Sequence, residues 1–506
     1  MVRRTTFIVA LITALIGFAS LPAAAQSART FYIDYASGSN SNSGLDKTHP
    51  WKTSPYMQTG ASCTGSGNAP SYTHAAGDQQ IFKGGVTWPA ACFQMTITAG
   101  GTSSAQDYYG VDLSWFSGGS FTRPLFDLAY ASLSGGNDAF QLTNGVTHVT
   151  IDNFEVAHQL IKVAAGYLFT GAAVHAVTYG GNTVKNGFFH DWATNDNFTD
   201  SSYGDFGNGC LLGAISLMDS TECSDVNGYV FNGGVKHFVR WGGACENCSE
   251  VQNSKFHDVF AGCFSVNSCH DNEFYNVVSD AQTFCNTTGA GCHTQIIEDD
   301  GGANFNKWYN NLIHDNTAAV TIFGCTGDSI YNNVIWNSGN FAIMLDTHCS
   351  NSTSTTVGSV YNNTVDCSNS AGCFRYFYRS NGTPGILNLQ NNHWITNGNP
   401  VCTNNVGAGC ANTVGGTQSN NITMSTSTAK SQGYTYASYY EPTSSTNGTV
   451  NAAVNLSALC PSGLGSLCTD RLHVPRLTSW DAGAYKFGSQ SPSKVNPPTN
   501  LTAIAQ

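Results

Sequence analysis

The chain has 506 residues, of which only 10% are charged and 12% are aromatic, and 54 are glycine. This composition is typical of a turn-rich β protein and argues against a mainly helical or a disordered chain. The net charge of −12 and the absence of a basic run argue against nucleic-acid binding, and they disfavour a polyanionic ligand unless calcium or a few local bases compensate.

The first residues have the pattern of an export signal. Arg3 and Arg4 precede an apolar run over residues 7–21, and three alanines at 23–25 provide small residues for cleavage. A membrane anchor is the alternative, but the run is short for a transmembrane helix and no second apolar stretch follows. We therefore expect residues 1–25 to be a signal peptide and the mature chain to be secreted, to the periplasm or the extracellular medium.

Short strand-like stretches then alternate with turn residues. Residues 31–33 alternate like a strand, a Ser/Asn/Gly turn cluster spans residues 37–45, and residues 76–85 place a short strand between Gly-Asp and Gly-Gly. Residues 194–228 are long, polar and acidic. Such an insertion can carry function in a solenoid, although a solvated loop is the alternative. Looser phrases that place Asn shortly before Phe occur at residues 151–154, 185–189, 252–256 and 271–274.

A clearer repeat occupies residues 309–397. Two asparagines stand before a mostly apolar pair, and the phrase recurs after 22, 30 and 29 residues, a period that indicates a solenoid. Asn tolerates the left-handed conformation of a turn, and rungs about 4.8 Å apart would let equivalent Asn side chains form a hydrogen-bonded ladder. The repeat predicts a parallel β-helix with turn asparagines outside and apolar pairs inside; a generic Asn-rich loop protein is the alternative. The copies begin at Tyr309, Tyr331, Tyr361 and Gln390.

Three further phrases resemble those of a known group of proteins. They are Pro-Trp-Lys-Thr at residues 50–53, Gly-Asp to Gly-Gly at residues 77–85, and Trp-Asp-Ala-Gly-Ala-Tyr at residues 480–485, which is similar to a last strand. Together with the repeat, they resemble secreted proteins of the right-handed parallel β-helix, pectate-lyase-like superfamily. The resemblance implies an all-β, right-handed parallel β-helix solenoid whose relatives are lyases, hydrolases and epimerases of polysaccharides, with some members that only bind.

The resemblance also implies a domain division. We expect one parallel β-helix domain over residues 26–488, followed by a linker-like tail at 489–506. Within the domain we expect an N-terminal cap and first rungs, a main coil, and C-terminal rungs with a cap, at residues 26–90, 140–400 and 401–488 respectively.

The 18 cysteines of an exported chain predict disulfides. Cys325 and Cys349 are about one rung apart and are placed to join adjacent rungs. A zinc site built from Cys245, Cys248, Cys263 and Cys269 is the less favoured alternative. Other pairs are close in sequence: Cys210 with Cys223, Cys285 with Cys292, Cys367 with Cys373, Cys402 with Cys410, and Cys460 with Cys468.

The densest candidate catalytic group lies at residues 293–302. If this stretch is a strand entering a turn, Glu298 and Asp300 share one face at roughly 6.5 to 7 Å, since a strand rises about 3.3 Å per residue. This spacing suits the acid and base of an inverting glycoside hydrolase. The opposite strand phase would expose Asp299 instead. The three adjacent acids also form a candidate Ca²⁺ site, because calcium prefers oxygen ligands.

Other residues could join this group. Asp346 and His348 end a strand two rungs later, so stacked strand ends would place Asp346 roughly 9 to 10 Å from the acids. His293 begins the acidic stretch and is a candidate substrate-binding residue. Turn-capping carboxylates and solvated side chains are the alternative for all of them. We expect His190, His257 and His314, which follow rung phrases, to be turn residues.

A lyase would need a base that removes a proton next to a uronate carboxyl, and a cation that neutralises that carboxyl. Lys307, Arg375 and Arg379 are candidates for these roles, and Tyr376 and Tyr378 for stacking on sugar rings. The sequence thus predicts an exported enzyme, expected to act as a monomer, that cleaves an extended and uronic-acid-containing polysaccharide by lyase or hydrolase chemistry. A non-catalytic carbohydrate-binding or surface β-helix protein is the alternative.

Overall fold

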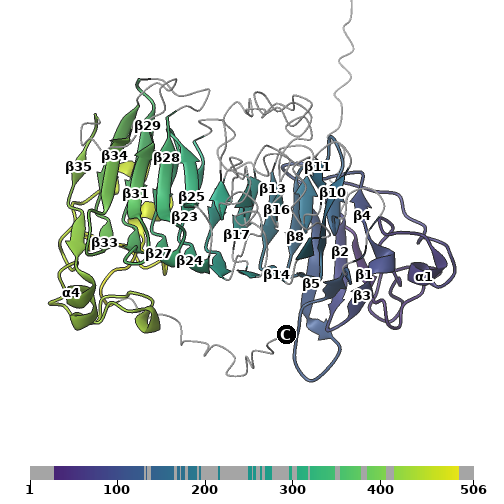
Figure 1. The fold of residues 1–506 in the computed structure, drawn as a ribbon. Helices are drawn as coiled ribbons and strands as arrows, with labels where there is room; N and C mark the ends of the chain where they lie inside the picture. The colour runs from purple at the N-terminus through teal and green to yellow at the C-terminus, as the bar shows by residue number, and fades with distance from the viewer. Residues whose placement is uncertain are drawn as a thin grey trace, which may run out of the picture.

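The secondary structure is almost entirely β, and its long sheets consist of parallel strands that run along one coil (Figure 1). Each turn of the coil adds one strand to each of three sheets, which we call A, B and C. This is the predicted right-handed parallel β-helix. The computed structural model describes residues 28–129, 131, 133, 138–164, 168–170, 173–176, 181–190, 193–194, 215–216, 249–252, 255–257, 263–264, 268–275, 296–298, 305–316, 320–347, 354–377, 385–405 and 415–488.

The strands of the three sheets follow one another in rung order. Sheet A consists of β1 (Thr30–Ile33), β2 (Gln79–Gly84), β5 (Asp107–Phe116), β8 (Val149–Asp152), β13 (Asn182–Lys185), β17 (Ser249–Gln252), β20 (Ser268–His270), β23 (Lys307–Tyr309), β26 (Ser329–Tyr331), β29 (Val357–Tyr361), β32 (Ile386–Gln390) and β35 (Gln418–Ser419). Sheet B consists of β3 (Thr87–Pro89), β6 (Leu125–Asp127), β9 (Glu155–Ala157), β14 (Phe188–His190), β18 (Lys255–His257), β21 (Glu273–Tyr275), β24 (Leu312–Asn316), β27 (Val334–Ser338), β30 (Thr364–Asp366), β33 (His393–Ile395) and β36 (Ile422–Met424). Sheet C consists of β4 (Met95–Ile97), β7 (Phe140–Leu142), β12 (Val174–Ala176), β16 (Ile215–Ser216), β19 (Cys263–Phe264), β22 (Ile297–Glu298), β25 (Val320–Cys325), β28 (Phe341–Asp346), β31 (Gly372–Phe377) and β34 (Val401–Asn405).

Short elements complete the described part of the chain. A small sheet contains β10 (Leu160–Ala164), β11 (Leu168–Thr170) and β15 (Ala193–Thr194). The helical turns near the N-terminus are α1 (Ala61–Thr64) and η1 (Ala90–Cys92). Those after the last rung are α4 (Thr426–Ser431), η3 (Tyr436–Ser438), η4 (Ser457–Leu459) and η5 (Gly465–Cys468).

The interior of the coil is filled by stacked apolar side chains. Neighbouring strands pair in register, so equivalent residues lie directly over one another. The buried rows are Trp308, Ile330, Val360 and Leu389 in sheet A, Ile313, Ile335, Val365 and Trp394 in sheet B, and Ile297, Ile322, Ile343 and Phe374 in sheet C.

The paired asparagines form the predicted ladder at the turn between sheets A and B. Asn311 donates its backbone N–H and its Nδ2 group to Oδ1 of Asn333, each at 3.0 Å. The same pattern continues to Asn363, Asn392 and Asn421. One part of the expectation was wrong, because the second Asn of each pair from Asn311 to Asn392 is buried inside the corner. The first Asn of each pair takes the left-handed conformation, with φ between 51° and 62° in the four clear copies.

The first asparagines of three copies, Asn332, Asn362 and Asn391, donate to backbone oxygens of a long C-terminal segment, residues 426–488, which we call the C-terminal wrap. Asn332 donates to the backbone oxygens of Ser466 and Thr469 at 3.1 and 3.0 Å. Buried Arg476 donates back to Oδ1 of Asn332 at 3.1 Å. The wrap therefore lies on the outside of the coil and covers its Asn turns. Residues 480–485, expected to be a last strand, belong to the wrap instead, and Trp480 forms only an isolated bridge with Ala453.

Disulfides are present, as the cysteine content predicted. Cys367–Cys373 and Cys460–Cys468 confirm two of the expected pairs. Cys63–Cys92, which joins α1 to η1, was not foreseen. Cys269, proposed as a zinc ligand in the less favoured interpretation, is also disulfide-bonded, as are Cys325 and Cys402. Residues 1–25 and 489–506 lie outside the described residues. Within the described part, no helix has the length and apolar character needed to cross a bilayer.

Candidate functional site

Only part of the predicted site falls within the described residues. His293, Asp299, Asp300, His348, Tyr378 and Arg379 lie outside them. The backbone of Glu298 is described as the end of β22, without its side chain. Lys307, Asp346, Arg375 and Tyr376 are described in full.

The strand registers show which predicted residues share a row of sheet C. Glu298 pairs with Phe323, Phe323 with Met344, and Met344 with Arg375. Asp346 is in register with Cys325 and Phe377 instead. Glu298 and Asp346 are therefore in different rows, two residues apart along the strands. The expected distance of Asp346 from the acids stays a prediction, since Asp299 and Asp300 lie outside the described residues. β25 and β28 continue two residues past the row of Glu298, so their last residues belong to another row.

Asp346 also differs from expectation in its exposure. Its side chain is fully buried rather than open to a groove. Its backbone oxygen accepts bonds from the N–H and the hydroxyl of Thr326, both at 2.9 Å. Asp346 thus holds the turn after β25, and its charge acts on the neighbouring Arg375.

Arg375 lies on the outer face of sheet C. Its neighbours Phe374 and Tyr376 are fully buried, and because alternate strand residues face opposite ways, Arg375 points outward. Its guanidinium lies 5.1 Å from the ring centre of Phe341 and 4.5 Å from that of Phe377. Burial lowers the pKa of Arg375 and the charge of Asp346 raises it, and the side chain stays cationic at neutral pH.

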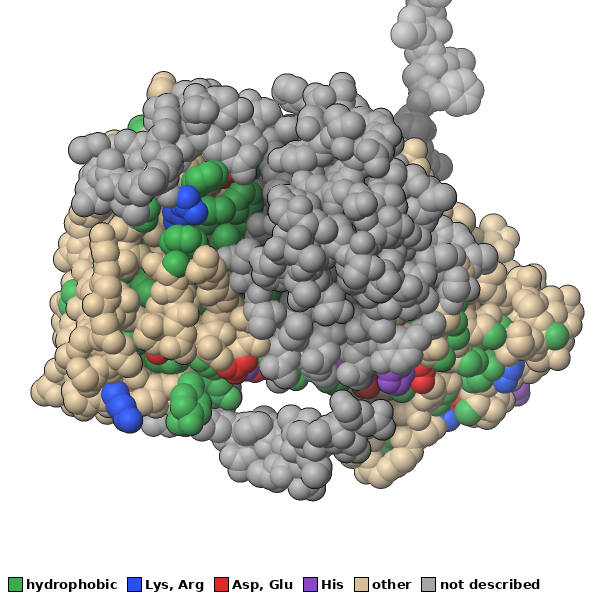
Figure 2. All heavy atoms as spheres, in the orientation of Figure 1, with side chains coloured by type: hydrophobic (Ala, Val, Ile, Leu, Met, Phe, Trp, Pro, Cys, Tyr) green, Lys and Arg blue, Asp and Glu red, His purple; other side chains and the backbone are tan. Residues whose placement is uncertain are grey.

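An apolar surface surrounds Arg375. Phe341 and Phe377 pack against the buried side chains of Val320, Phe323 and Met344. A cavity of about 330 Å³ lies beside Arg375 and is also lined by Phe341, Asn399, Pro400 and Val401. Figure 2 shows a basic side chain surrounded by hydrophobic ones on the face over β28. We call Phe341, Arg375 and Phe377 the arginine clamp.

The residues predicted to stack on sugar rings differ from those that the structure places on the outer face of sheet C. Tyr376 was expected to stack on sugar, but it is fully buried and its hydroxyl accepts the N–H of Gly385 at 3.2 Å. Phe377 takes the outward position instead. Phe341 was missed because it belongs to the previous rung, 34 residues earlier in the chain. Residues two positions apart in a strand face the same side, so the position of Phe377 two residues after Arg375 could have identified it in the sequence.

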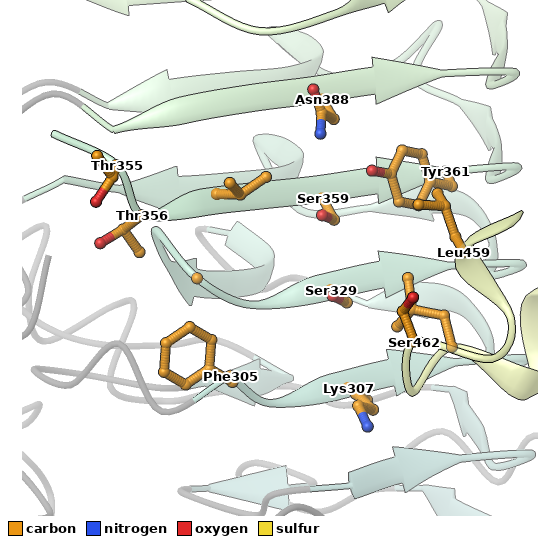
Figure 3. Close-up of a pocket in the computed structure, with 13 residues that line it drawn as sticks. Phe305, Lys307, Ser329, Thr355, Thr356, Ser359, Tyr361, Asn388, Leu459 and Ser462 are labelled. Atoms are coloured by element: carbon orange, nitrogen blue, oxygen red, sulfur yellow. The ribbon is translucent and has the colours of Figure 1, made fainter. Parts of the chain in front are cut away.

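Lys307 lies on a different sheet from Glu298 and Arg375. It occupies β23 of sheet A, in a row with Ser329, Ser359 and Asn388. This row forms the floor of a cavity of about 560 Å³, with Phe305 and Thr356 on one side and Leu459 and Ser462 of the C-terminal wrap on the other (Figure 3). Lys307, one of the three candidate basic residues of the lyase interpretation, therefore does not share a site with Glu298 and Arg375 of sheet C.

We had expected His190, His257 and His314 to be turn residues, but the structure places them in strands. Each is the third residue of a strand of sheet B, and they form one row with Tyr275 and Trp336. Nε2 of His190 lies 3.2 Å from Glu155, and Nε2 of His314 lies 3.4 Å from Glu273. Their recurrence two residues after the start of each sheet B strand was the signal in the sequence.

The candidate calcium site cannot be built from described side chains, since Asp299 and Asp300 lie outside the described residues. Within the described part of the chain, no group of three or more His, Cys, Asp or Glu side chains is placed to hold a metal ion.

The comparisons with known proteins find similarity only among solved structures. No protein-family model and no curated protein sequence matches the chain. GH136 lacto-N-biosidase from Eubacterium ramulus aligns at 12% identity and TM-score 0.40, over 78% of this chain and 67% of that one. A rhamnogalacturonan lyase aligns at 13% identity and TM-score 0.39, over 78% and 87% of the two chains. Pectate lyase Pel9A aligns at 14% identity and TM-score 0.38, over 90% and 96%. Because these values are low, the assignment of the fold rests on the parallel sheets and their registers.

Proposed function

We propose that the chain is an exported enzyme that cleaves an extended, uronic-acid-containing polysaccharide along the outer face of sheet C. The observation that carries this proposal is the arginine clamp, in which the guanidinium of Arg375 lies half-buried between Phe341 and Phe377. The disulfides suit an oxidising compartment outside the cytosol.

The chemistry of the clamp matches an acidic sugar. A guanidinium presents paired donors that fit a carboxylate with two parallel hydrogen bonds. Partial desolvation by Phe341 and Phe377 strengthens such a pair, since competing water is displaced. The flanking aromatic rings supply apolar surface for the carbon faces of the sugar. A chain of net charge −12 repels an acidic polymer overall. The guanidinium of Arg375 supplies a local positive charge that offsets this repulsion.

The arginine clamp and the candidate catalytic acids lie at different places along the coil. Glu298 and Arg375 share one row but lie three rungs apart, roughly 14 Å at about 4.8 Å per rung. A sugar carboxylate held by Arg375 therefore belongs to a different unit from one that reaches Glu298. Arg375 acts as a substrate-positioning residue, and Glu298 with the adjacent acids is the candidate catalytic group.

Two reaction types fit these residues. In a hydrolase, Glu298 and Asp300 divide the acid and base roles. In a lyase, Glu298, Asp299 and Asp300 would hold calcium, which would neutralise the uronate carboxyl, and a base would remove the proton next to that carboxyl. Arg375 serves the substrate in both versions.

A non-catalytic binding protein is the second candidate, and the groove around Lys307 favours it. This groove is the larger of the cavities discussed above, and its described lining contains hydroxyl, amide, lysine and apolar side chains but no carboxylate. Such a lining can hold a sugar chain but offers no acid and base pair.

A panel of soluble acidic and neutral polysaccharides, assayed in two ways, tests the proposal. Absorbance of unsaturated uronate products indicates a lyase, and new reducing ends without that absorbance indicate a hydrolase. We expect one of these signals from at least one uronic-acid polymer. Tight binding of a polymer with no product from any of them would contradict the enzyme and favour the binding protein.

A further inference from the structure

A third cavity, on sheet B, is lined by acidic side chains, in contrast to the basic arginine clamp. It has a volume of about 430 Å³ and lies between the outer face of sheet B and the C-terminal wrap. The coil contributes Asp315, Trp336 and Asp366, and the wrap contributes Tyr436 and Tyr440. We call these five residues the sheet B pocket.

The aromatic part of the pocket is held by the rung stacking. Trp336 is in register with His314 and Asp366 on the neighbouring rungs. The rings of Trp336 and His314 stack at 4.3 Å and 3°, and the ring of Tyr440 lies 5.6 Å from Trp336. Tyr436 is 70% exposed at the rim. The pocket thus combines a buried, fixed indole at its base with an exposed phenol at its rim.

Both carboxylates of the pocket are fixed in orientation. Asp315 contacts Nδ1 of His314 at 2.8 Å and accepts Nδ2 of Asn337 at 2.7 Å. Asp366 accepts the hydroxyl of Tyr440 at 2.7 Å and the N–H of Ser368 at 3.0 Å. Each carboxylate oxygen has two lone pairs, so the oxygens keep acceptor capacity for a ligand.

The electrostatic field of the pocket is negative. Its described lining contains Asp315 and Asp366 but no lysine or arginine. Burial raises the pKa of Tyr440, and the charges of Asp366 and Asp315 raise it further, so both carboxylates act on the same phenol. An anionic ligand would be repelled here, whereas a ligand rich in hydroxyl donors would find fixed acceptors.

We propose that the sheet B pocket binds a neutral sugar unit of a polysaccharide, with its hydroxyls donating to Asp315 and Asp366 and its apolar face against Tyr436. This site lies on a different sheet from the arginine clamp and has the opposite charge. It goes beyond the proposed function, because it does not require that the chain cleave a uronic-acid polymer.

Affinity gel electrophoresis of the whole chain tests this proposal with no need for catalysis. The probes are arabinoxylan and galactomannan as neutral polymers and polygalacturonate as the acidic one. We expect at least one neutral polymer to retard the wild type. Tyr436→Ala should weaken that retardation about tenfold, as expected for loss of one stacked aromatic ring. Asp366→Asn should weaken it as well. Leu113→Ala, which changes an exposed apolar residue of β5, should leave it unchanged.

Three results would overturn the proposal. One is no retardation by either neutral polymer. Another is retardation that both Tyr436→Ala and Asp366→Asn leave intact while their melting temperatures match that of the wild type. The third is thermal stabilisation by calcium alone that Asp366→Asn abolishes, since it would make the pocket a cation site. Any binding of polygalacturonate should be retained in Tyr436→Ala, because acidic polymers are assigned to the arginine clamp.

Discussion

Asn333 donates both its backbone N–H and its side-chain amide to Oδ1 of Asn363, each at 3.0 Å. The same amide also donates to the backbone oxygen of Trp308 at 2.9 Å. One buried side chain therefore connects three successive rungs of the coil. This connection fixes the position of each rung over the next, and so fixes which residues of sheets B and C share a row.

Replacement of Asn333 by Ala should lower the free energy of unfolding by about 3 kcal/mol or more. The change removes Oδ1 of Asn333, which accepts both the backbone N–H and the Nδ2 group of Asn311. It also removes the Nδ2 group that donates to the buried backbone oxygen of Trp308. Urea denaturation measures the loss. Asn340→Ala, at an exposed turn, is the matched control and should change stability by less than about 0.5 kcal/mol. Equal effects of the two substitutions would contradict a structural role for the ladder.

Docking of the C-terminal wrap should weaken as the pH rises through the raised pKa of His473. His473 of the wrap lies 2.9 Å from Asp271 of the coil, and this hydrogen bond raises the pKa of His473. Burial of Asp271 raises its pKa, but bonds from His270 and His473 outweigh burial and bring it to about 2. The ion pair is therefore complete below about pH 6.5, with Asp271 still ionised, and is lost as the pH rises through the raised pKa of His473.

Hydrogen exchange of residues 465–485, corrected for intrinsic rates, measures this docking. We expect stronger protection at pH 5.5 than at pH 8.5 in the wild type. His473→Asn is a suitable variant, because Asn tolerates the positive φ of this position but carries no charge. An unchanged pH dependence in His473→Asn would show that other groups control the wrap.

Acid should destabilise the last rungs through His393. This side chain is fully buried under Tyr434, and burial lowers its pKa to about 3. Between about pH 6.5 and pH 3 the unfolded chain binds a proton that the folded chain does not, so stability falls as the pH falls through this window. His393→Leu should flatten the dependence of the urea midpoint between pH 7 and pH 4. Exposed His49→Leu should leave that dependence intact, and a flattening by both would refute the assignment to His393.

Substitution of Glu298 by Gln should reduce kcat by about 100-fold or more and leave polymer binding nearly unchanged, since a general acid or base acts only on the chemical step. Asp300→Asn should do the same in the hydrolase version. Initial rates and affinity gels separate the two effects. Full activity in both variants would remove the acidic stretch from the catalytic site.

The repeat allowed the fold to be predicted, because each rung phrase carries its own turn asparagines and apolar pair. The C-terminal wrap could not be predicted, since its contacts join residues such as Asn332 and Ser466, which are 134 positions apart. Glu298 and Asp346 fall in different rows because β25 and β28 extend two residues past the row of Glu298, and strand registers of this kind cannot be read from the sequence.

The site was harder to predict than the fold for a related reason. The aromatic partners of Arg375 lie two residues away on its own strand and on the preceding rung, and only the register shows that Phe341 is adjacent. The sheet B pocket requires Tyr436 and Tyr440 from the wrap, which no local pattern connects to Trp336.

The central claim is that Arg375 recognises the carboxylate of an acidic sugar, and one binding measurement tests it most directly. Calorimetry would compare an oligouronate with its carboxyl-reduced form, against the wild type and Arg375→Gln. We predict that the wild type prefers the acidic oligomer by about tenfold or more, as expected for a charge-assisted bidentate pair, and that Arg375→Gln loses most of this preference. Equal preference in both proteins would contradict the claim.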